Sequence, residues 1–532
     1  MNTKAKELVF EEDARAFLRD GIEQLAEVVA MTLGPRGRNV GIDASWGSPM
    51  ISSDGYTICK DLELKNPVLN MGGSMGKEVA AKIKEKSGDG TTTGIVLLRA
   101  LVQAGLKNIA AGANPTAIKR GMDKGLESIL SEIDRIAVSI QNSVETRNIA
   151  TVSASGNTEI GEIISKCFEK VGKTGVVAIE EGKGTETTIE LVEGMQFDKG
   201  YISAYFCTNN EKLTVEMSHP AILITDKKIA SAQEILPILQ QVAAAGQELL
   251  IIADDLEGDA LSTLVVNKLR GSLKIAAVKA PGFGDSRKAM LEDLAILTGG
   301  QLVTEEKGLI LREVGAEVLG HADQLTISKD KTTIVGGKGS AESIKTRIEQ
   351  LEAQAAKASS KYDKEKLEER KAKLQGGVAL IQVGAPTESE MKKKKQMYED
   401  SLNSTRAALE EGIVPGGGIA LLQAGRSAQL SLSQDELIGA NILCKACEAP
   451  FRQIVTNTGL DASVVLDEVL SRQSKSFGFN ALSETIEDLL LAGIIDPVKV
   501  VKSSLRHAVS MAGVVLLSEA LIANAEEKEE SV

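Results

Sequence analysis

Aromatic residues are scarce in this chain of 532 amino acids: they make up 3% of the residues, and there is one tryptophan. Long apolar runs are missing as well, since no uncharged apolar stretch approaches the ~18 residues that a membrane-spanning helix needs. The N-terminal segment, residues 1–20, has neither the apolar core of a secretory signal nor the acid-poor pattern of a transit peptide. We therefore expect a protein without a membrane partner that is either cytoplasmic or already processed.

Cysteine and histidine are too sparse to organise a fold or a metal site. The chain has five cysteines and three histidines, which is too few for the disulfide framework of an extracellular protein and indicates a reducing compartment. Only Cys444 and Cys447 form a C-x-x-C pair, and no second pair accompanies it. The residues therefore give little support to a redox centre, a zinc site or a histidine-based triad.

Basic residues are outnumbered by acidic ones. Lysine and arginine total 61, aspartate and glutamate total 74, and the net charge is −13. Proteins that follow a nucleic-acid backbone need a basic surface that neutralises many phosphates. We therefore expect no nucleic-acid partner.

The apolar pattern divides the chain into helical ends and a mixed middle. The length corresponds to about three or four domains at ~150 residues each. The first ~130 and last ~120 residues show helical spacing of Ala, Leu and Val, whereas strand-like runs at 249–253, 275–278 and 301–304 alternate with helical patterns. This predicts a multidomain α+β chain whose two ends pack together as one discontinuous, mainly helical domain around an α/β domain.

Four local patterns make specific predictions. An amphipathic helix around residues 18–29 has Asp13 as its candidate N-cap. Short strands are expected at 39–43 and 50–53. Apolar residues on nearly every face predict a buried helix over 92–109, and a charged helical pair is expected over 341–374.

Glycine-rich segments are the candidates for chemistry, and SGDGTTT at 87–93 is the sharpest of them. Gly88 and Gly90 allow backbone N–H groups to approach a ligand closely, and the positive end of the buried helix begins here. A phosphate fits such a place. Asp89 would repel a bare phosphate, so its presence makes sense if Mg²⁺ lies between the two.

A second D-G turn makes Asp54 a candidate general base or anchor of the same site. From the residues alone, an ordinary Asp-Gly turn remains the alternative interpretation of each of these segments. The familiar nucleotide fingerprints are missing: Gly172-Lys173-Thr174 resembles the end of a P-loop, but Cys167 stands where its first glycine belongs. Neither a P-loop kinase nor a Rossmann oxidoreductase is supported.

Longer motifs connect the chain to a known family. In chain order they include LGPRGRN (33–39), SGDGTTT (87–93), VEGMQFDKGYIS (192–203), LLIIADDLEGDALSTLVVNKLRG (249–271), AVKAPGFGD (277–285), KLQGGVALIQVGAPTESEMKKKK (373–395), EEGIVPGGG (410–418) and AGIIDPVKV (492–500). From about residue 6 to 523 the chain resembles the bacterial-type, group I chaperonins of the GroEL family. Motifs of this length do not coincide by chance.

The resemblance implies an ATP-dependent chaperonin, an ATPase of the protein-folding isomerase class, in the bacterial cytoplasm, or in an organelle matrix or stroma if the chain is processed. Such a chaperonin captures non-native polypeptides and encloses them in rings of seven subunits, usually two stacked, under a small co-chaperonin lid. The implied domains are an equatorial ATP-binding domain (1–135 and 411–532), an intermediate hinge domain (136–192 and 378–410) and an apical domain (193–377).

The resemblance also assigns the nucleotide site. Asp89 would bind Mg²⁺, and K⁺ is a further candidate cation. Asp54 and Asp400 would position the attacking water, with Asp400 delivered by the intermediate domain. The other residues expected to contact ATP are Thr32, Leu33, Gly34, Pro35, Gly90, Thr91, Thr92, Thr93, Gly416, Gly417, Asn480, Ala481 and Asp496.

Apolar stripes on two expected helices, near residues 236–242 and 261–266, are the second functional feature. Stripes at helical spacing usually face a core; a client-binding role requires them to be exposed. The residues that the resemblance assigns to client and co-chaperonin binding are Tyr201, Tyr205, Phe206, Leu236, Leu239, Leu261, Val265 and Val266.

Two departures from the family pattern leave an alternative function open. Ser53 stands where the family usually has a lysine beside the D-G turn, and the tail at 525–532 replaces the usual Gly-Gly-Met repeat. They favour a divergent paralogue that acts as a holdase or hetero-ring subunit with weak ATP turnover. The presence of Asp54, Asp89 and Asp400 favours an ATP-hydrolysing folding chaperonin.

Overall fold

The computed structural model divides into two compact units, Met1–Ser165 with Lys393–Val532, and Lys166–Lys392. Both divisions fall inside the expected intermediate domain, and the three-domain bounds stay a prediction. The residues that the structure describes are 6–43, 50–140, 142–154, 156–172, 175–182, 184–209, 213–358, 360–375, 377–428, 432–472 and 474–524.

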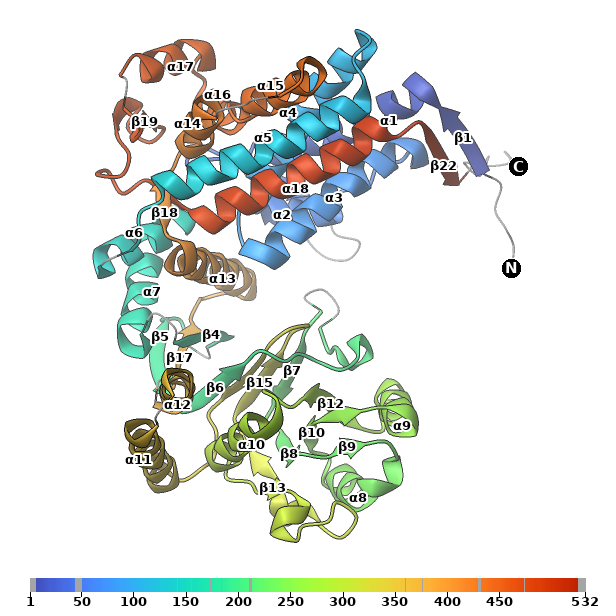
Figure 1. The fold of residues 1–532 in the computed structure, drawn as a ribbon, viewed down its shortest axis with the longest axis vertical. Helices are drawn as coiled ribbons and strands as arrows, with labels where there is room; N and C mark the ends of the chain where they lie inside the picture. Colours follow the sequence, from blue (N-terminus) through green and yellow to red (C-terminus); the bar gives the residue numbers. More distant parts are fainter. Residues whose placement is uncertain are drawn as a thin grey trace. The chain divides into compact units, whose positions relative to one another are not determined.

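Long helices from both ends of the chain form the core of the first unit (Figure 1). They are α1 (Glu11–Ala30), α3 (Pro67–Ser87), α4 (Thr91–Ala110), α5 (Pro115–Ile136) and α18 (Val498–Leu517). Helix α18 packs against α3, α4 and α5, and strand β1 (Lys6–Phe10) pairs antiparallel with β22 (Ala520–Asn524). The first and last segments therefore share one hydrophobic core.

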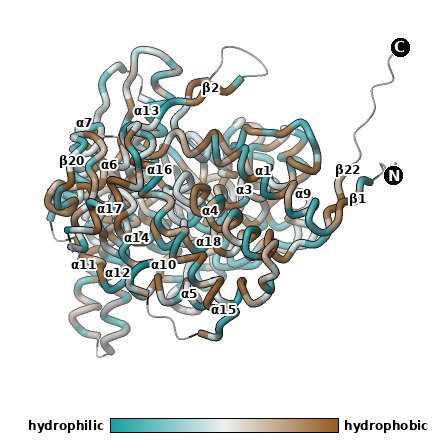
Figure 2. The backbone as a smooth tube through the Cα atoms, turned by 90° about the horizontal axis from the view of Figure 1, so that it is seen from above, coloured by the Kyte–Doolittle hydropathy of each residue, from teal (hydrophilic) through white to brown (hydrophobic). Residues whose placement is uncertain are grey.

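Helix α4 is the buried helix that the sequence predicts over 92–109. Ile95, Leu98 and Leu101 have no exposed surface. Helix α18 is apolar and long enough to cross a membrane by length and composition, but 61% of its apolar window is buried inside the unit. Figure 2 shows apolar stretches of the chain running through the part of the unit that contains α4 and α18.

The start of α1 corrects one local prediction. The helix begins at Glu11, directly after β1, and Phe10 occupies the N-cap position without a side-chain hydrogen bond. Asp13 is therefore not the cap. It lies in the first turn with Glu11 and Glu12, where negative side chains interact favourably with the positive end of the helix.

Shorter elements complete the first unit. The predicted strands near 39–43 and 50–53 are confirmed as an antiparallel pair, β2 (Val40–Ile42) and β3 (Met50–Ser52). The other elements are α2 (Gly55–Asp61), α6 (Ser143–Ser153), β18 (Ile413–Pro415), α14 (Ile419–Ser427), α15 (Gln434–Ala446), α16 (Ala449–Thr458), α17 (Ala462–Ser471), β19 (Phe477–Asn480), β20 (Thr485–Asp488) and β21 (Ile495–Pro497). Helices α7 (Thr158–Val171) and α13 (Glu388–Glu411) run from one unit into the other.

A mainly parallel sheet lies in the second unit. Its strand order is β12 (Lys274–Lys279), β10 (Glu248–Ala253), β8 (Ala221–Thr225) and β13 (Leu302–Val303), with β14 (Gly320–His321) antiparallel on β8. The connecting segments carry helices α8 (Leu236–Ala245), α9 (Gly258–Leu269) and α10 (Gly284–Thr298). The predicted alternation of strands and helices is confirmed, and the near-continuous apolar strands are typical of a parallel sheet covered on both faces.

Two further sheets belong to this unit. One has the antiparallel order β6 (Gly194–Phe197), β16 (Thr332–Val335), β15 (Gln324–Ile327) and β7 (Val215–Ser218). In the other, β17 (Val378–Val383) lies between β4 (Val176–Glu181) and β5 (Thr188–Val192). The short strands β9 (Lys228–Ile229) and β11 (Asp255–Leu256) pair separately, and the 3-10 turns are η1 (Ala204–Phe206), η2 (Ala232–Glu234), η3 (Glu305–Lys307) and η4 (Ala316–Val318).

The charged helical pair is confirmed as α11 (Ala341–Lys357) and α12 (Lys361–Gln375). Asp293 of α10 accepts hydrogen bonds from Arg347 and Arg370, each at 2.8 Å from Nε. Because this carboxylate is almost fully buried, its two guanidinium partners tie the helical pair firmly to α10.

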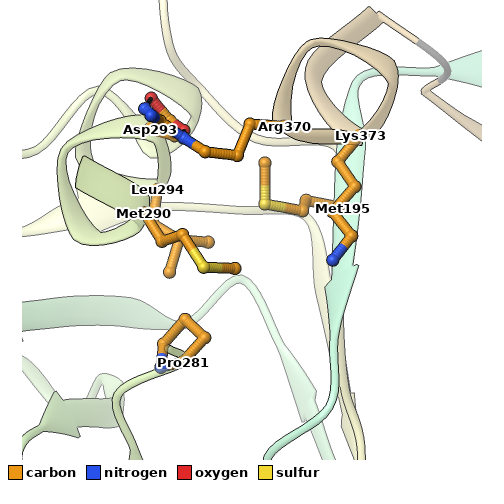
Figure 3. A pocket seen from close by; sticks show the side chains of 7 residues that line it. All are labelled: Met195, Pro281, Met290, Asp293, Leu294, Arg370 and Lys373. Atoms are coloured by element: carbon orange, nitrogen blue, oxygen red, sulfur yellow. Dashed lines mark hydrogen bonds and ion pairs between the residues drawn. The ribbon is translucent and has the colours of Figure 1, made fainter. Parts of the chain in front are cut away.

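A small cavity lies beside this ion-pair cluster. Figure 3 shows Met195 and Met290 pointing into it and Arg370 reaching Asp293. Its volume is about 10 Å³, close to the space that one water molecule needs. It is a packing gap and not a ligand site.

Candidate functional site

Asp54 caps the first turn of α2. Its carboxylate accepts hydrogen bonds from the Thr57 backbone N–H at 2.8 Å and from the Thr57 hydroxyl at 2.6 Å. Aspartate is a favoured N-cap because its side chain satisfies an N–H that has no partner within the helix. The D-G turn is therefore a capped helix start that holds the Asp54 carboxylate in a fixed orientation.

The SGDGTTT segment joins the end of α3 to the start of α4. Gly88 and Gly90 have φ of +74° and +89°, a backbone region that favours glycine. A Cβ on Gly88 would lie 2.3 Å from the Cβ of Asn403, and one on Gly90 would lie 2.5 Å from the Ser504 hydroxyl oxygen. Both glycines are required by the turn and by its close neighbours.

Asp89 stands between these glycines with both carboxylate oxygens engaged. One accepts a hydrogen bond from the Gly90 N–H at 2.6 Å, and the other accepts from the Ser404 hydroxyl at 2.8 Å. Ser404 belongs to α13, so α13 contacts the turn directly. The contact fixes the Asp89 carboxylate beside the N-terminal end of α4.

The two D-G turns meet at this helix end. A Cβ placed on Gly55 would lie 2.1 Å from the Thr92 hydroxyl oxygen and 3.2 Å from that of Thr91. Only a glycine lets the start of α2 come this close to the start of α4. The structure thus brings Asp54, Thr91 and Thr92 to one place, as a shared phosphate site requires.

Asp400 reaches the same place from α13. Its carboxylate accepts hydrogen bonds from the Lys84 ammonium and from the Gln396 side-chain amide, the latter at 2.9 Å. Burial raises the pKa of Asp400 to about 7, and although Lys84 opposes the rise, the negative charges of Asp54 and Asp89 add to it. A carboxyl group with this pKa can take up or release a proton near neutral pH.

Lys84 is the cation that sequence reasoning missed. Burial alone would lower its pKa, but the charges of Asp400, Asp54 and Asp89 outweigh burial and raise it, so the ammonium stays charged. In the sequence it is one of three alternating lysines in KIKEK, residues 82–86. Lys82 and Lys86 share one face of the helix and Lys84 points away from them, but no local pattern shows that this other face meets carboxylates from distant segments.

Asp496 lies in β21, which pairs with β18 beside the glycine segment at 416–418. Burial, and secondarily the charge of Asp89, raise the pKa of Asp496 to about 7. The Gly416 N–H donates to the Ile494 carbonyl at 2.9 Å. A Cβ on Gly417 would lie 3.7 Å from the Phe479 carbonyl oxygen, so this segment lies close to the end of β19.

Asn480 and Ala481 are linked to the first glycine-rich segment. The Arg36 guanidinium donates to the Ala481 carbonyl at 3.3 Å and forms an ion pair with Glu484 at 3.2 Å. The Leu33 carbonyl accepts from the Asn457 side-chain amide at 2.8 Å. The residues expected to contact ATP therefore lie on segments that neighbour one another within the first unit.

The donors present fit a magnesium-bound nucleotide. Within the described part of the chain no three His, Cys, Asp or Glu side chains form a metal-binding group by themselves. Mg²⁺ is usually held by one or two carboxylates together with phosphate oxygens and water. Asp89 can supply the carboxylate, and the N–H groups at the start of α4 can receive the phosphates.

A larger cavity of about 310 Å³ lies nearby between α1, α4 and α16. Its lining includes Glu27, Arg38 and Arg99, but none of the residues expected to contact ATP. The residues predicted for chemistry lie instead at the two D-G turns, at the start of α4 and on α13.

The expected client-binding residues differ widely in exposure. Tyr205 is 65% exposed, Leu236 45% and Val266 43%. Tyr201, Leu261 and Val265 are half-buried and pack against the core of the second unit.

For two of these residues, the structure contradicts the exposure that was predicted. Phe206 has no exposed surface and Leu239 has 7%. Leu239 lies with Ile238 and Val242 on the buried side of α8, and all three belong to the hydrophobic core of the second unit. The exposure that a client contact requires is absent at Phe206 and Leu239.

Comparisons with known proteins agree with one another. The model of the TCP-1/cpn60 chaperonin family matches residues 25–526. Chaperonin GroEL 3 of Protochlamydia amoebophila (strain UWE25) is 61% identical over 526 residues, which cover 99% of this chain and 98% of that protein. The crystal structure of the chaperonin gp146 from the bacteriophage EL 2 (Pseudomonas aeruginosa), in presence of ATP-BeFx, covers 99% of this chain and 100% of its own with a TM-score of 0.71. At 20% identity, that structure supports the fold alone.

Proposed function

Because the chain belongs to the TCP-1/cpn60 chaperonin family, we propose that the carboxylates gathered at the start of α4 bind Mg²⁺-ATP and hydrolyse it to drive protein folding. The chain is an ATP-dependent, protein-folding chaperonin of the bacterial GroEL type. No comparison favours the alternative of a holdase or hetero-ring subunit with weak turnover. A bacterial cytoplasmic location is the corresponding proposal.

The observation that carries this proposal is the meeting of three carboxylates from separate segments. The charges of Asp54, Asp89 and Asp400 all act on one ammonium group, that of Lys84. Burying acids beside one another costs free energy unless a cation compensates it. A site of this kind is suited to a divalent cation that arrives with a phosphate ligand, and K⁺ is a further candidate.

Each carboxylate has a distinct proposed role in ATP hydrolysis. Asp89 would hold Mg²⁺, which when bound neutralises phosphate charge. Gly90 and the threonines at the start of α4 would contact the phosphates. Asp54 and Asp400 would orient the water that attacks the γ-phosphorus, since catalysis of phosphoryl transfer rests mainly on positioning and electrostatics.

Asp400 is also suited to receive the proton of that water. A base works best when its pKa lies near the working pH, and the pKa of Asp400 is about 7. Thr32 to Pro35, Gly416, Gly417, Asn480, Ala481 and Asp496 would surround the rest of the nucleotide, as the family resemblance assigns them.

Capture of non-native polypeptides is proposed for the exposed apolar residues of the second unit. Tyr205 lies in η1, which contacts α9, and η2 contacts both α8 and α9. The exposed residues Tyr205, Leu236 and Val266 therefore belong to neighbouring elements. Assembly into rings of seven, two of them stacked under a co-chaperonin lid, would multiply these weak contacts on one client and raise its affinity.

Substitutions at two leucines of α8 test client capture separately from the stability of the second unit. We expect Leu236→Ser to leave the free energy of unfolding nearly unchanged and to weaken capture, because this side chain is 45% exposed. Leu239→Ser is its matched control, and it should destabilise the second unit by about 2–5 kcal/mol because it opens a cavity and buries a hydroxyl. The measurements are thermal unfolding and suppression of aggregation of a chemically denatured protein.

The pair also has outcomes that contradict the proposal. Undiminished capture by Leu236→Ser at normal stability would remove Leu236 from the client surface. A Leu239→Ser protein with the parent's melting temperature would contradict the assignment of Leu239 to the core.

A further inference from the structure

The last turn of α3 directs one of its lysines into the carboxylate cluster. Lys84 donates a hydrogen bond to Asp400 of α13, and the two side chains are only 21% and 18% exposed. Its neighbour Lys82 is 52% exposed and pairs with Glu78 on the same helix. Lys84 is thus distinguished from an otherwise similar lysine by its partner and by its burial.

The direct contact of Lys84 is with Asp400, while Asp54 and Asp89 act on it through their charges. A second hydrogen bond to the Asp400 carboxylate comes from the side-chain amide of Gln396, a neutral group on the same helix. Asp54 and Asp89, from the two D-G turns, both disfavour a second negative charge nearby. Lys84 is therefore the group that makes an ionised Asp400 compatible with this place.

The contact also joins two elements. Lys84 is fixed in α3, and Asp400 is carried by α13, which runs on into the second unit. Asp89 and Ser404 form a second link from α13 to the same turn at 2.8 Å. These two links lie one helical turn apart on α13. Together they hold the face of α13 that bears Asp400 toward the turn that contains Asp89.

We propose that Lys84 is a positioning residue for ATP hydrolysis, which holds the Asp400 carboxylate ionised and correctly placed for the attacking water. The proposal rests on the proposed role of Asp400. Since Lys84 acts through Asp400 and not on the nucleotide, its loss should lower the turnover number and leave the half-saturating concentration of Mg²⁺-ATP nearly unchanged.

The experiment compares variants of the full-length protein by steady-state phosphate release. We expect Lys84→Met to lower turnover by roughly tenfold to a hundredfold, the range typical of partners that orient a reacting group. Lys84→Arg keeps the charge and should retain most of the turnover. Lys82→Met is the matched control, and its turnover should equal that of the parent protein.

A double variant separates positioning from a general loss of structure. If Lys84 acts through Asp400, Lys84→Met should cause little further loss in an Asp400→Asn background, whereas independent effects would multiply. Binding of Mg²⁺-ATP by Lys84→Met, measured by calorimetry, should match the parent and shows that the site is folded.

The outcomes are distinct. A raised half-saturating concentration with unchanged turnover would make Lys84 a nucleotide ligand and overturn the proposal, as would unchanged kinetics in Lys84→Met or full multiplication in the double variant. Parent-like turnover in Asp400→Asn would instead overturn the role of Asp400 itself, so failure of the underlying function is recognised separately.

Discussion

Asp89→Asn is expected to lose Mg²⁺-dependent nucleotide binding, the largest effect of any single replacement in this site. Asparagine can still accept the hydrogen bond from the Gly90 N–H, so the turn should keep its shape. The replacement removes the negative charge that a Mg²⁺ ion requires. Because residues that merely orient metal ligands contribute roughly 10- to 100-fold, loss of the ligand itself should weaken Mg²⁺-ATP binding by about 100-fold or more.

Calorimetric titration with Mg²⁺-ATP measures this effect directly. Asp123→Asn is a suitable control, since Asp123 is an exposed carboxylate on α5 that pairs with Lys119. Its titration should match that of the parent. Undiminished Mg²⁺-ATP affinity in Asp89→Asn would mean that the Asp89 carboxylate only caps the turn.

Asp400→Asn is expected to do the opposite, with nucleotide binding kept and hydrolysis lost. The side chain keeps its size and one oxygen acceptor, but it can no longer take a proton from the attacking water. General-base groups typically contribute about 10²–10⁴-fold to the rate, so turnover should fall by at least about 10²-fold. The affinity for Mg²⁺-ATP should change little, because Asp400 is assigned neither to the metal ion nor to the phosphates.

Single-turnover phosphate release with bound Mg²⁺-ATP separates the chemical step from product release. The replacement leaves the Lys84 ammonium without its charged partner, so thermal unfolding has to be compared as well. A variant with slow hydrolysis, parent-like affinity for Mg²⁺-ATP and a parent-like melting temperature supports the assignment. Parent-like single-turnover rates would show that Asp400 has no part in the chemistry.

The glycine turn proposed to bind phosphate, and the buried helix after it, could be predicted from the sequence because their patterns are local. Gly88 and Gly90 take the positive φ that only glycine adopts freely, and the buried helix after them follows from its continuous apolar pattern. The sequence also indicated that the ends of the chain share a core. Each of these inferences depends on residues within a few turns of one another.

The environment of Asp400 could not be predicted in the same way. It depends on Lys84, which lies 316 positions away in the chain, and on which lysine of an alternating run faces inward. The raised pKa of Asp496 has the same origin, because burial and the approach of Asp89 arise only in the folded chain. Long-range burial of charge leaves no periodic pattern in the sequence.

The apolar stripes show a different limit. Leu236 and Leu239 are three positions apart on α8 and lie on overlapping faces of a helix, yet one is exposed and the other is buried. The sequence identifies an apolar stripe, but the packing of α8 in the folded unit decides which of its residues the core covers. Phe206 was assigned to the client surface by the family resemblance, and the structure buries it in the core of the second unit.

The central claim is that hydrolysis of ATP by this chain drives protein folding. The most direct measurement is the recovered activity of a chemically denatured enzyme incubated with the full-length protein and a co-chaperonin, with Mg²⁺-ATP or without nucleotide. We predict capture without nucleotide, recovery of activity only with Mg²⁺-ATP, and little recovery when Asp400→Asn replaces the parent protein. Equal recovery with and without Mg²⁺-ATP, or full recovery with Asp400→Asn at its reduced turnover, would contradict the account.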